Sequence, residues 1–432
     1  MARLLNTRDP GFQSAFTALL RDRNEAVADV ADTVRAIIDD VRRRGDEALH
    51  EYTTRFDGFD SRSAGLRITA EEIAQARARI DPEVLEALAL AAERIRAYHE
   101  RQMPDDELWT DAIGARLGHK WTPVSAAGLY VPGGLAAYPS SVLMNAIPAK
   151  VAGVDRLAMA VPTPKGAVND LVLAAADLAG VDEVWRIGGA QAIAALAYGT
   201  ESIAPVDIIV GPGNAFVAEA KRQVFGQVGI DMIAGPSEVL IIADGSADPA
   251  WLAADLLAQA EHDEKAQSIL ITPDADLARE VLDAVTAQLA DLPKRDIAGK
   301  SWQDHGAVIV VRDLDEAVAL ANRVAPEHLE LEVAEPEALL ADIRNAGAIF
   351  LGGYTPEAVG DYVAGPNHVL PTSGSARFSS GLNVLQFMKR TTILGCSREA
   401  LNAIGPAAVK LAEAEGLEAH ARSVRMRLNK EA

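Results

Sequence analysis

The sequence predicts an α/β protein in which parallel β-sheets carry helices on both faces. Short β-rich runs alternate with alanine-rich helical segments from about residue 124, and a second alternating series begins near residue 235. Strands that alternate with helices are typical of βαβ units, whose strands lie parallel. The chain has 432 residues, which is too long for one ordinary core and indicates two or three domains.

The composition is that of a globular protein and excludes some kinds of partner. Hydrophobic residues make up 49% and charged residues 24%, with a formal net charge of −21. This charge argues against nucleic acid and anionic membranes, because phosphate binding needs clustered Lys and Arg. No signal peptide and no run of ~18 apolar residues is found, so no membrane span is expected. The single cysteine, Cys396, excludes an internal disulfide and favours the cytoplasm.

The first hundred residues are predicted to be helical and carry no evident chemistry. Apolar residues recur at helical spacing in 27–44, which Gly45 ends, and in 82–101, for which Asp81 is a plausible N-cap. Residues 103–122 are expected to form a connector.

Three glycine turns follow strand-like runs in the first βαβ series. They are VPGG at 131–134, GGAQ at 188–191 and GPGN at 211–214. Ligands of open α/β sheets bind at the carboxyl ends of strands, where helix N-termini hold phosphates. None of the turns is G-x-G-x-x-G, so the dinucleotide fingerprint is absent. Two interpretations of these glycines remain open: they bind a nucleotide, or they only form tight turns between strand and helix.

Gln259 and His262 are a candidate half of a metal site. They end a helix expected after Pro249, and their spacing of three places an oxygen and an imidazole nitrogen on one face. Asp361 and His368, in the Gly/Pro/Ser-rich stretch 351–383, would complete a ligand set. The alternative is a polar helix face in water.

Glu327 and His328 form an adjacent acid–imidazole pair after an amphipathic helix. Both groups can titrate near neutrality after modest pKa shifts, so they are candidates for two proton transfers. The alternative is a turn with an exposed acid and a packed histidine.

Two helices are expected at the C-terminus, one from Pro406 to Gly416 and one over 417–428. Glu415 is expected in the last turn of the first helix, where its negative charge opposes the helix macrodipole. This is a weak indication of a functional role, and the alternative is an acidic helix face in solvent. His420 lies on the second helix, and this arm could dock on a partner chain.

The motifs, taken in order, resemble those of the histidinol dehydrogenase family over nearly the whole chain. The run from IDMIAGPSEVLIIAD to LLAQAEH matches the family signature without a gap, at 230–262. The other matching stretches are VPGG, GGAQA, GPGNAFVAEAKR, APEHLEL, GDYVAGPNHVLPT and EGLEAH.

The resemblance implies two related, incomplete Rossmann-like domains with parallel sheets and small helical extensions at both termini. Residues 1–28 are expected to be the N-terminal extension, and 29–123 with 236–375 the domain that carries most metal and catalytic residues. Residues 124–235 would bind the nucleotide, and 376–432 would be a helical arm that reaches the partner subunit.

The implied activity is a zinc- and NAD-dependent, four-electron oxidation of L-histidinol to L-histidine through bound histidinaldehyde, the last two steps of histidine biosynthesis. Glu327 and His328 are the implied catalytic pair. The implied zinc ligands are Gln259, His262, Asp361 and His420, the last from the partner subunit of a homodimer. These ligands and His328 would also touch histidinol, together with Ser237, His368 and Glu415. The implied NAD contacts are Tyr130, Gln191 and Asn214.

Three alternatives are weighed against this function. A related enzyme could oxidise another alcohol, although such a substrate would not need both Glu415 and His420. An aldehyde dehydrogenase would use a thioester on Cys396, which is instead expected to pack as a small hydrophobe, buried or half-buried. A non-catalytic nucleotide- or metal-binding protein would bind its ligand without turnover.

Overall fold

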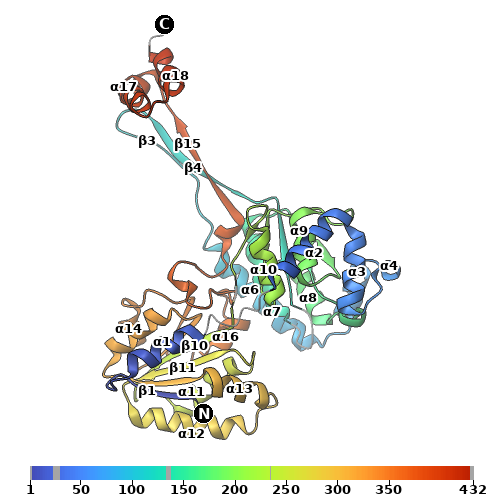
Figure 1. Ribbon diagram of the computed structural model, residues 1–432, viewed down its shortest axis with the longest axis vertical. Coiled ribbons are helices and arrows are strands. Elements are labelled where there is room, and N and C mark those ends of the chain that lie inside the picture. The colour runs from blue at the N-terminus through green and yellow to red at the C-terminus, as the bar shows by residue number, and fades with distance from the viewer. Residues whose placement is uncertain (1, 23–29, 133–137, 234, 429–432) are drawn as a thin grey trace. The chain divides into compact units, whose positions relative to one another are not determined.

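The computed structural model describes residues 2–22, 30–132, 138–233 and 235–428. The chain divides into two compact units, the first made of Met1–Gln102 with Ser125–Phe387 and the second of Met103–Val124 with Met388–Ala432. Among the described residues, the first unit holds two six-stranded sheets and the second a three-stranded sheet. The predicted α/β class with parallel sheets is confirmed (Figure 1).

One sheet of the first unit has the strand order β2-β7-β6-β5-β8-β9. We call it the N-sheet. Its strands are β2 (Arg67–Ile68), β5 (Ala126–Tyr130), β6 (Arg156–Ala160), β7 (Glu183–Trp185), β8 (Ile208–Val210) and β9 (Gly229–Ile230). The described pairs are parallel except β2 with β7.

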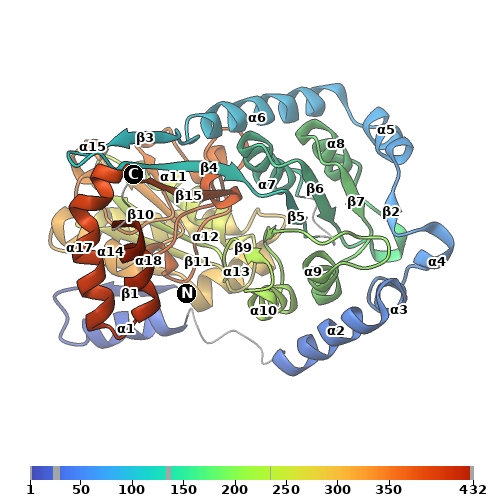
Figure 2. The same cartoon turned by 90° about the horizontal axis from the view of Figure 1, so that it is seen from above.

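Helices cover both faces of the N-sheet, as Figure 2 shows. One layer contains α2 (Ala31–Arg44), α3 (Asp46–Asp57), α9 (Gly189–Tyr198) and α10 (Ala215–Val224). The other contains α5 (Ala70–Ala78), α6 (Pro82–Glu100), α7 (Pro139–Ala152) and α8 (Asp170–Ala179). The short elements α4 (Ser61–Ala64) and η1 (Pro164–Gly166) lie in connections.

The other sheet, which we call the C-sheet, has the order β1-β12-β11-β10-β13-β14 and parallel pairs throughout its described strands. Its strands are β1 (Arg3–Asn6), β10 (Glu238–Ala243), β11 (Gln267–Thr272), β12 (Ala307–Val310), β13 (His328–Glu332) and β14 (Ala348–Leu351). Side chains alternate along each strand, so Leu240 and Ile242 join one core and Val239 and Ile241 the other. The C-sheet is therefore buried on both faces, as parallel sheets are.

The first core of the C-sheet includes α1 (Phe12–Asp22) and α14 (Leu314–Val324). The second includes α11 (Pro249–Ala260), α12 (Ala275–Leu289) and α13 (Arg295–His305). The remaining elements are α15 (Pro336–Leu340), α16 (Glu357–Tyr362), η2 (Ser375–Arg377) and η3 (Val384–Phe387).

The N-terminal residues divide between the sheets differently from the expected domains. β1 pairs with β12, so the expected extension 1–28 supplies an edge strand of the C-sheet. β2 pairs with β7 of the N-sheet, and the apolar stripe of α2 packs in the N-sheet core. The elements described between residues 30 and 102 therefore accompany the N-sheet, within 124–235, rather than 236–375. Helical periodicity shows that α2 has a face to bury, but it does not show against which sheet.

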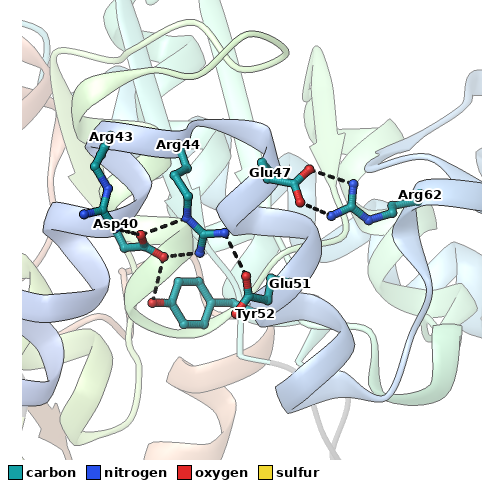
Figure 3. A network of polar contacts seen from close by, with 7 residues as sticks. All are labelled: Asp40, Arg43, Arg44, Glu47, Glu51, Tyr52 and Arg62. Atoms are coloured by element: carbon teal, nitrogen blue, oxygen red, sulfur yellow. Dashed lines mark hydrogen bonds and ion pairs between the residues drawn. The ribbon is translucent and has the colours of Figure 1, made fainter.

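Asp40 of α2 holds α2 and α3 together through a polar network (Figure 3). Its carboxylate accepts hydrogen bonds from Arg43, Arg44 and the Tyr52 hydroxyl, and Arg44 continues to Glu51 at 2.8 Å. Only 11% of the Asp40 side chain is exposed. The Arg44 guanidinium beside Asp40 holds the pKa of that carboxyl well below its usual range.

The second unit is an antiparallel ribbon with a helical hairpin (Figure 1). It contains β3 (Glu107–Thr110), β4 (Arg116–Pro123), β15 (Met388–Gly395), α17 (Arg398–Ala414) and α18 (Glu418–Leu428). The expected connector at 103–122 thus forms strands, because β4 pairs along its whole length with β15. The expected helix start at Pro406 is wrong. The helix α17 begins at Arg398, where the Ser397 side chain caps it, and Pro406 lies inside the helix.

Candidate active site

His328 is the first residue of β13, so it lies at the amino edge of the C-sheet. Its Nδ1 is 3.0 Å from the backbone oxygen of Glu238, at the start of the neighbouring β10. A carbonyl oxygen only accepts, so Nδ1 carries the proton of the neutral ring and Nε2 holds the lone pair. Nε2 is buried without a hydrogen-bond partner among the described residues. In its neutral form the ring therefore presents the lone pair of Nε2 to its surroundings.

Carboxylates surround the His328 ring. Nδ1 lies 3.9 Å from Oε2 of Glu327 and 3.5 Å from Oε2 of Glu357, while Nε2 lies 3.5 Å from Oδ1 of Asp361. Burial opposes protonation, but these three acids raise the pKa of His328 well above its ordinary value.

Glu327 is buried directly before β13, and its side chain contacts the start of the neighbouring strand β10. Its Oε2 accepts the backbone N–H of Glu238 at 2.9 Å. Burial raises the pKa of Glu327 to about 7, against the opposing influence of His328. A carboxyl group that titrates near neutrality can both take and return a proton, which is the property of a general base.

Asp361 is placed on α16 by a close contact with β14. Gly360 before it leaves no room for a side chain, because a Cβ there would lie 2.5 Å from the ring of Phe350. The same ring lies 5.9 Å from the His328 imidazole, centroid to centroid. Burial opposes ionisation of Asp361, but His328 and two further histidines hold its pKa below the ordinary value.

Gln259 and His262 come from the C-terminal end of α11, which returns to the amino edge of the C-sheet. Gln259 is buried, and its Nε2 has no partner in the part of the chain that the structure describes. His262 is exposed to solvent in part, but the atoms around it desolvate its imidazole and lower its pKa. The Asp361 carboxylate opposes this lowering of the pKa, and His328 adds to it. His262 thus lies within electrostatic reach of both residues.

His368 lies half-buried beside Asp361. Its Nδ1 is 2.9 Å from the backbone oxygen of Asp361, and its Nε2 is 3.3 Å from the Ser141 hydroxyl of α7. Burial lowers the pKa of His368. Ser237 directly precedes β10, where its backbone oxygen accepts from Gln267 at 3.0 Å. Most of the predicted residues at 237–368 therefore gather around one edge of the C-sheet.

Glu415 and His420 belong to the second unit and are exposed. Glu415 follows α17, and His420 lies in the first turn of α18. Their predicted roles are not tested by the arrangement within the first unit.

The predicted nucleotide contacts lie at the carboxyl edge of the N-sheet. Tyr130 ends β5, and its buried hydroxyl accepts the backbone N–H of Gly189 at 3.0 Å. Burial raises the pKa of Tyr130 to about 12, so the hydroxyl keeps its proton. Gln191, in the first turn of α9, is buried with Oε1 unpartnered among the described residues. One hydroxyl proton and one amide oxygen are thus available to a ligand beside a helix N-terminus.

Asn214 is the N-cap of α10. Its Oδ1 accepts from the backbone of Phe216 and Val217 at 3.0 and 3.2 Å, which leaves the side-chain amide free to donate. The turns at 188–191 and 211–214 therefore both open helices, as predicted. Of the turn at 131–134, Gly133 and Gly134 lie outside the described residues.

The sequence analysis did not identify a group of buried and half-buried acids that lies near the candidate site. Among the described residues, one oxygen each from Asp255, Glu330 and Glu332 lie within 4.8 Å of one another. Burial first, and then the neighbouring acids, raise the pKa of Glu330 well above its ordinary value. The pKa of Glu332 is raised to about 7 and that of Glu357 to about 8. The available signal was the run H-L-E-L-E in a strand of a parallel sheet, because such strands are buried on both faces.

Cys396 is exposed in the second unit, so the expectation that it packs as a buried hydrophobe is wrong. No described helix combines the length and apolar character that a bilayer crossing demands.

A buried imidazole ringed by acids on one parallel sheet, and helix-opening glycine turns on another, define an α/β enzyme. A family model described as histidinol dehydrogenase matches residues 20–428. The chain belongs to the histidinol dehydrogenase family and is an oxidoreductase.

Relatives and a solved structure match the chain over almost its full length. Histidinol dehydrogenase from Rhodospirillum rubrum is 65% identical over 427 residues, covering 99% of this chain and 98% of the relative. The enzyme of that name from Ruegeria pomeroyi is 66% identical over 430 residues, covering 100% and 99%. The crystal structure of histidinol dehydrogenase from Elizabethkingia anophelis superposes with a TM-score of 0.95 at 36% identity, covering 99% and 98%.

Proposed function

We propose that the chain oxidises L-histidinol to L-histidine through bound histidinaldehyde, with NAD as oxidant and zinc in the site, as the last two steps of histidine biosynthesis. The observation that carries the proposal is the His328 ring, whose Nδ1 is held by the Glu238 backbone oxygen, while Nε2, beside Asp361, has no hydrogen-bond partner among the described residues. An alcohol oxidation requires such an oriented base, and the family's name gives the alcohol. The single cysteine favours a cytoplasmic location.

Gln259, His262 and Asp361 would hold the zinc ion, with His420 from a second copy of the chain. The set is two imidazoles, one carboxylate and one amide oxygen, which suits zinc. Within the described part of the chain, the buried Gln259 amide has an atom without a partner, and half a turn of the amide exchanges its nitrogen and oxygen. A cation at Asp361 would offset that carboxylate and lower the pKa of His328 towards the range of a working base.

Tyr130, Gln191 and Asn214 would bind NAD. Tyr130 and Asn214 have donors that their own hydrogen bonds leave free, and Gln191 has a buried oxygen without a partner among the described residues. When bound, zinc supplies a template for the amine and imidazole of histidinol, and NAD supplies the hydride acceptor.

The chain's own groups would move the protons. His328 takes the alcohol proton at Nε2 in the first oxidation. Glu327 takes a proton from the water that adds to the aldehyde, before the second oxidation. Both are buried, so they act away from bulk water. Ser237, His368 and Glu415 would contact histidinol, with the Glu415 carboxylate facing its ammonium group.

A homodimer with shared sites would explain why Glu415 and His420 are exposed polar residues of the second unit. Mixed dimers test this directly. Asp361→Asn and His420→Asn variants should each be inactive, and random mixing should restore about a quarter of the wild-type activity, because half of the dimers then contain one intact site. Activity that stays absent after verified subunit exchange would contradict the shared site.

The test of the whole function is NADH formation with L-histidinol before EDTA treatment, after it, and after zinc is restored. Two NADH for each histidinol, lost with EDTA and regained with zinc, are expected. One NADH would show that oxidation stops at the aldehyde. No NADH from zinc-loaded protein would redirect the search to other alcohols and then to a binding protein.

A further inference from the structure

A buried ion pair holds the turn that opens α10. Lys221 of α10 and Asp231, just after β9, form a salt bridge in which 4% and 1% of their side chains are exposed. Both also bind one residue, Gly211. The Lys221 ammonium donates to the Gly211 carbonyl oxygen at 3.0 Å, and Asp231 Oδ2 accepts the Gly211 N–H at 2.8 Å. The pair thus occupies both polar backbone groups of a single turn residue.

Gly211 has a conformation that only glycine adopts readily. Its φ is +112°, and a Cβ there would lie 2.1 Å from the backbone oxygen of Tyr130. Two residues later, a Cβ on Gly213 would lie 2.3 Å from Val217 of α10. The turn is therefore tightly confined between β5 and α10, and it ends at Asn214.

Asp231 extends the arrangement into the segment between the sheets. Its Oδ1 accepts the backbone N–H of Met232 at 2.7 Å. A buried ion pair is costly to desolvate, and apolar residues of similar size often serve stability as well or better. Packing alone therefore does not explain a buried ion pair at this position. The hydrogen bonds to Gly211 indicate that the pair holds the turn.

We propose that Lys221 and Asp231 are positioning residues that set the 211–214 turn, and with it Asn214 and the α10 N-terminus, in the geometry that binds the nicotinamide dinucleotide. The inference rests on the proposed function for the cofactor. Neither residue needs to touch the dinucleotide. They act through Gly211, whose peptide groups would otherwise reorient towards other partners.

The test is NADH binding to full-length protein, followed by NADH fluorescence. Lys221→Met removes the donor and keeps the length of the side chain. The single variant leaves the buried Asp231 carboxylate without its cation and could fail to fold for that reason. The double variant Lys221→Met/Asp231→Asn also removes this charge, so it serves as the second test of the proposal. Arg222→Met is the matched control. Arg222 lies on the same helix, but its side chain is 64% exposed and pairs with Glu219.

Both Lys221 variants should bind NADH at least about tenfold more weakly, since a lost hydrogen bond to a charged group typically has an effect of this size. Arg222→Met should bind like wild type. The KM for NAD should rise by a similar factor, with kcat changed less and the KM for histidinol unchanged. A structural role alone would lower the folded fraction and kcat without changing the NADH dissociation constant.

The outcomes separate the two proposals. If wild type binds no NADH, the proposed cofactor is wrong. If wild type binds NADH and folded Lys221 variants bind it equally well, the positioning role is overturned.

Discussion

The imidazole of His328 is hydrogen-bonded through Nδ1 to the backbone oxygen of Glu238, 3.0 Å away on the neighbouring strand. Because both residues open parallel strands, the sheet itself orients the ring. The result is a base at the amino edge of the C-sheet, whereas ligands of open α/β sheets usually bind at the carboxyl edge. The glycine turns of the N-sheet lie at its carboxyl edge, where that rule would place a ligand.

Glu327→Gln should slow oxidation of supplied histidinaldehyde far more than oxidation of histidinol. The amide keeps the shape of the side chain but cannot take a proton from water, and such losses are typically about 10²–10⁴-fold. Single-turnover NADH formation from each substrate gives the comparison. His328→Gln is the contrasting variant and should mainly slow the alcohol step. Equal losses in both steps for Glu327→Gln would remove its assigned role.

Asp361→Asn should lower bound zinc, because a neutral amide is a weaker ligand than a carboxylate. A loss of affinity of at least about tenfold is expected. Elemental analysis after dialysis against a weak chelator measures it. Asp342→Asn, at an exposed position, is the control and should keep its zinc. Full zinc occupancy in Asp361→Asn would exclude this carboxylate as a ligand.

Glu330→Gln should raise thermal stability at pH 8 and make it less dependent on pH. Burial and the neighbouring acids raise the pKa of Glu330 well above its ordinary value, and that of Glu332 to about 7. Unfolded glutamates titrate near pH ~4.3, so above that pH the folded chain holds protons that the unfolded chain has lost. Stability therefore falls as the pH rises from about 5 to 8.

Melting temperatures at pH 5.5 and pH 8 would measure this effect. Relative to wild type, the Glu330→Gln variant should gain about 1 kcal/mol or more at pH 8. Glu337→Gln, an exposed change on α15, should follow the wild-type profile. A Glu330→Gln profile that parallels the wild type would mean that the cluster is not a source of charge repulsion.

Asp40→Asn should lower the free energy of unfolding by about 1 kcal/mol, a value limited because the arginines of the network are partly exposed. Asp39→Asn is the matched control, since Asp39 is 64% exposed and lies 3.8 Å from Arg42. The lowered pKa of Asp40 adds stability above the unfolded value near ~3.9 that is lost as the pH falls through the folded value. Equal melting temperatures for both variants at pH 7 would contradict the importance of the network in Figure 3.

The sequence by itself determined the α/β class, several of the helices and the candidate residues. Local signals were enough where the physical cause is local: Asp81, the expected N-cap, caps α6 through the Glu83 N–H. The motif order also indicated the family that the comparisons establish.

Only the tertiary structure decided which segments pair and which charges meet. The pairing of β4 with β15 joins residues more than 260 positions apart, and no local pattern in 103–122 specifies it. Likewise, the strand alternation at 328–332 shows which side chains share a face, but not that Asp255 and Glu357 lie beside them. Electrostatic effects depend on distance and burial, so the raised pKa values of Glu327 and Glu330 arise from packing and not from sequence order.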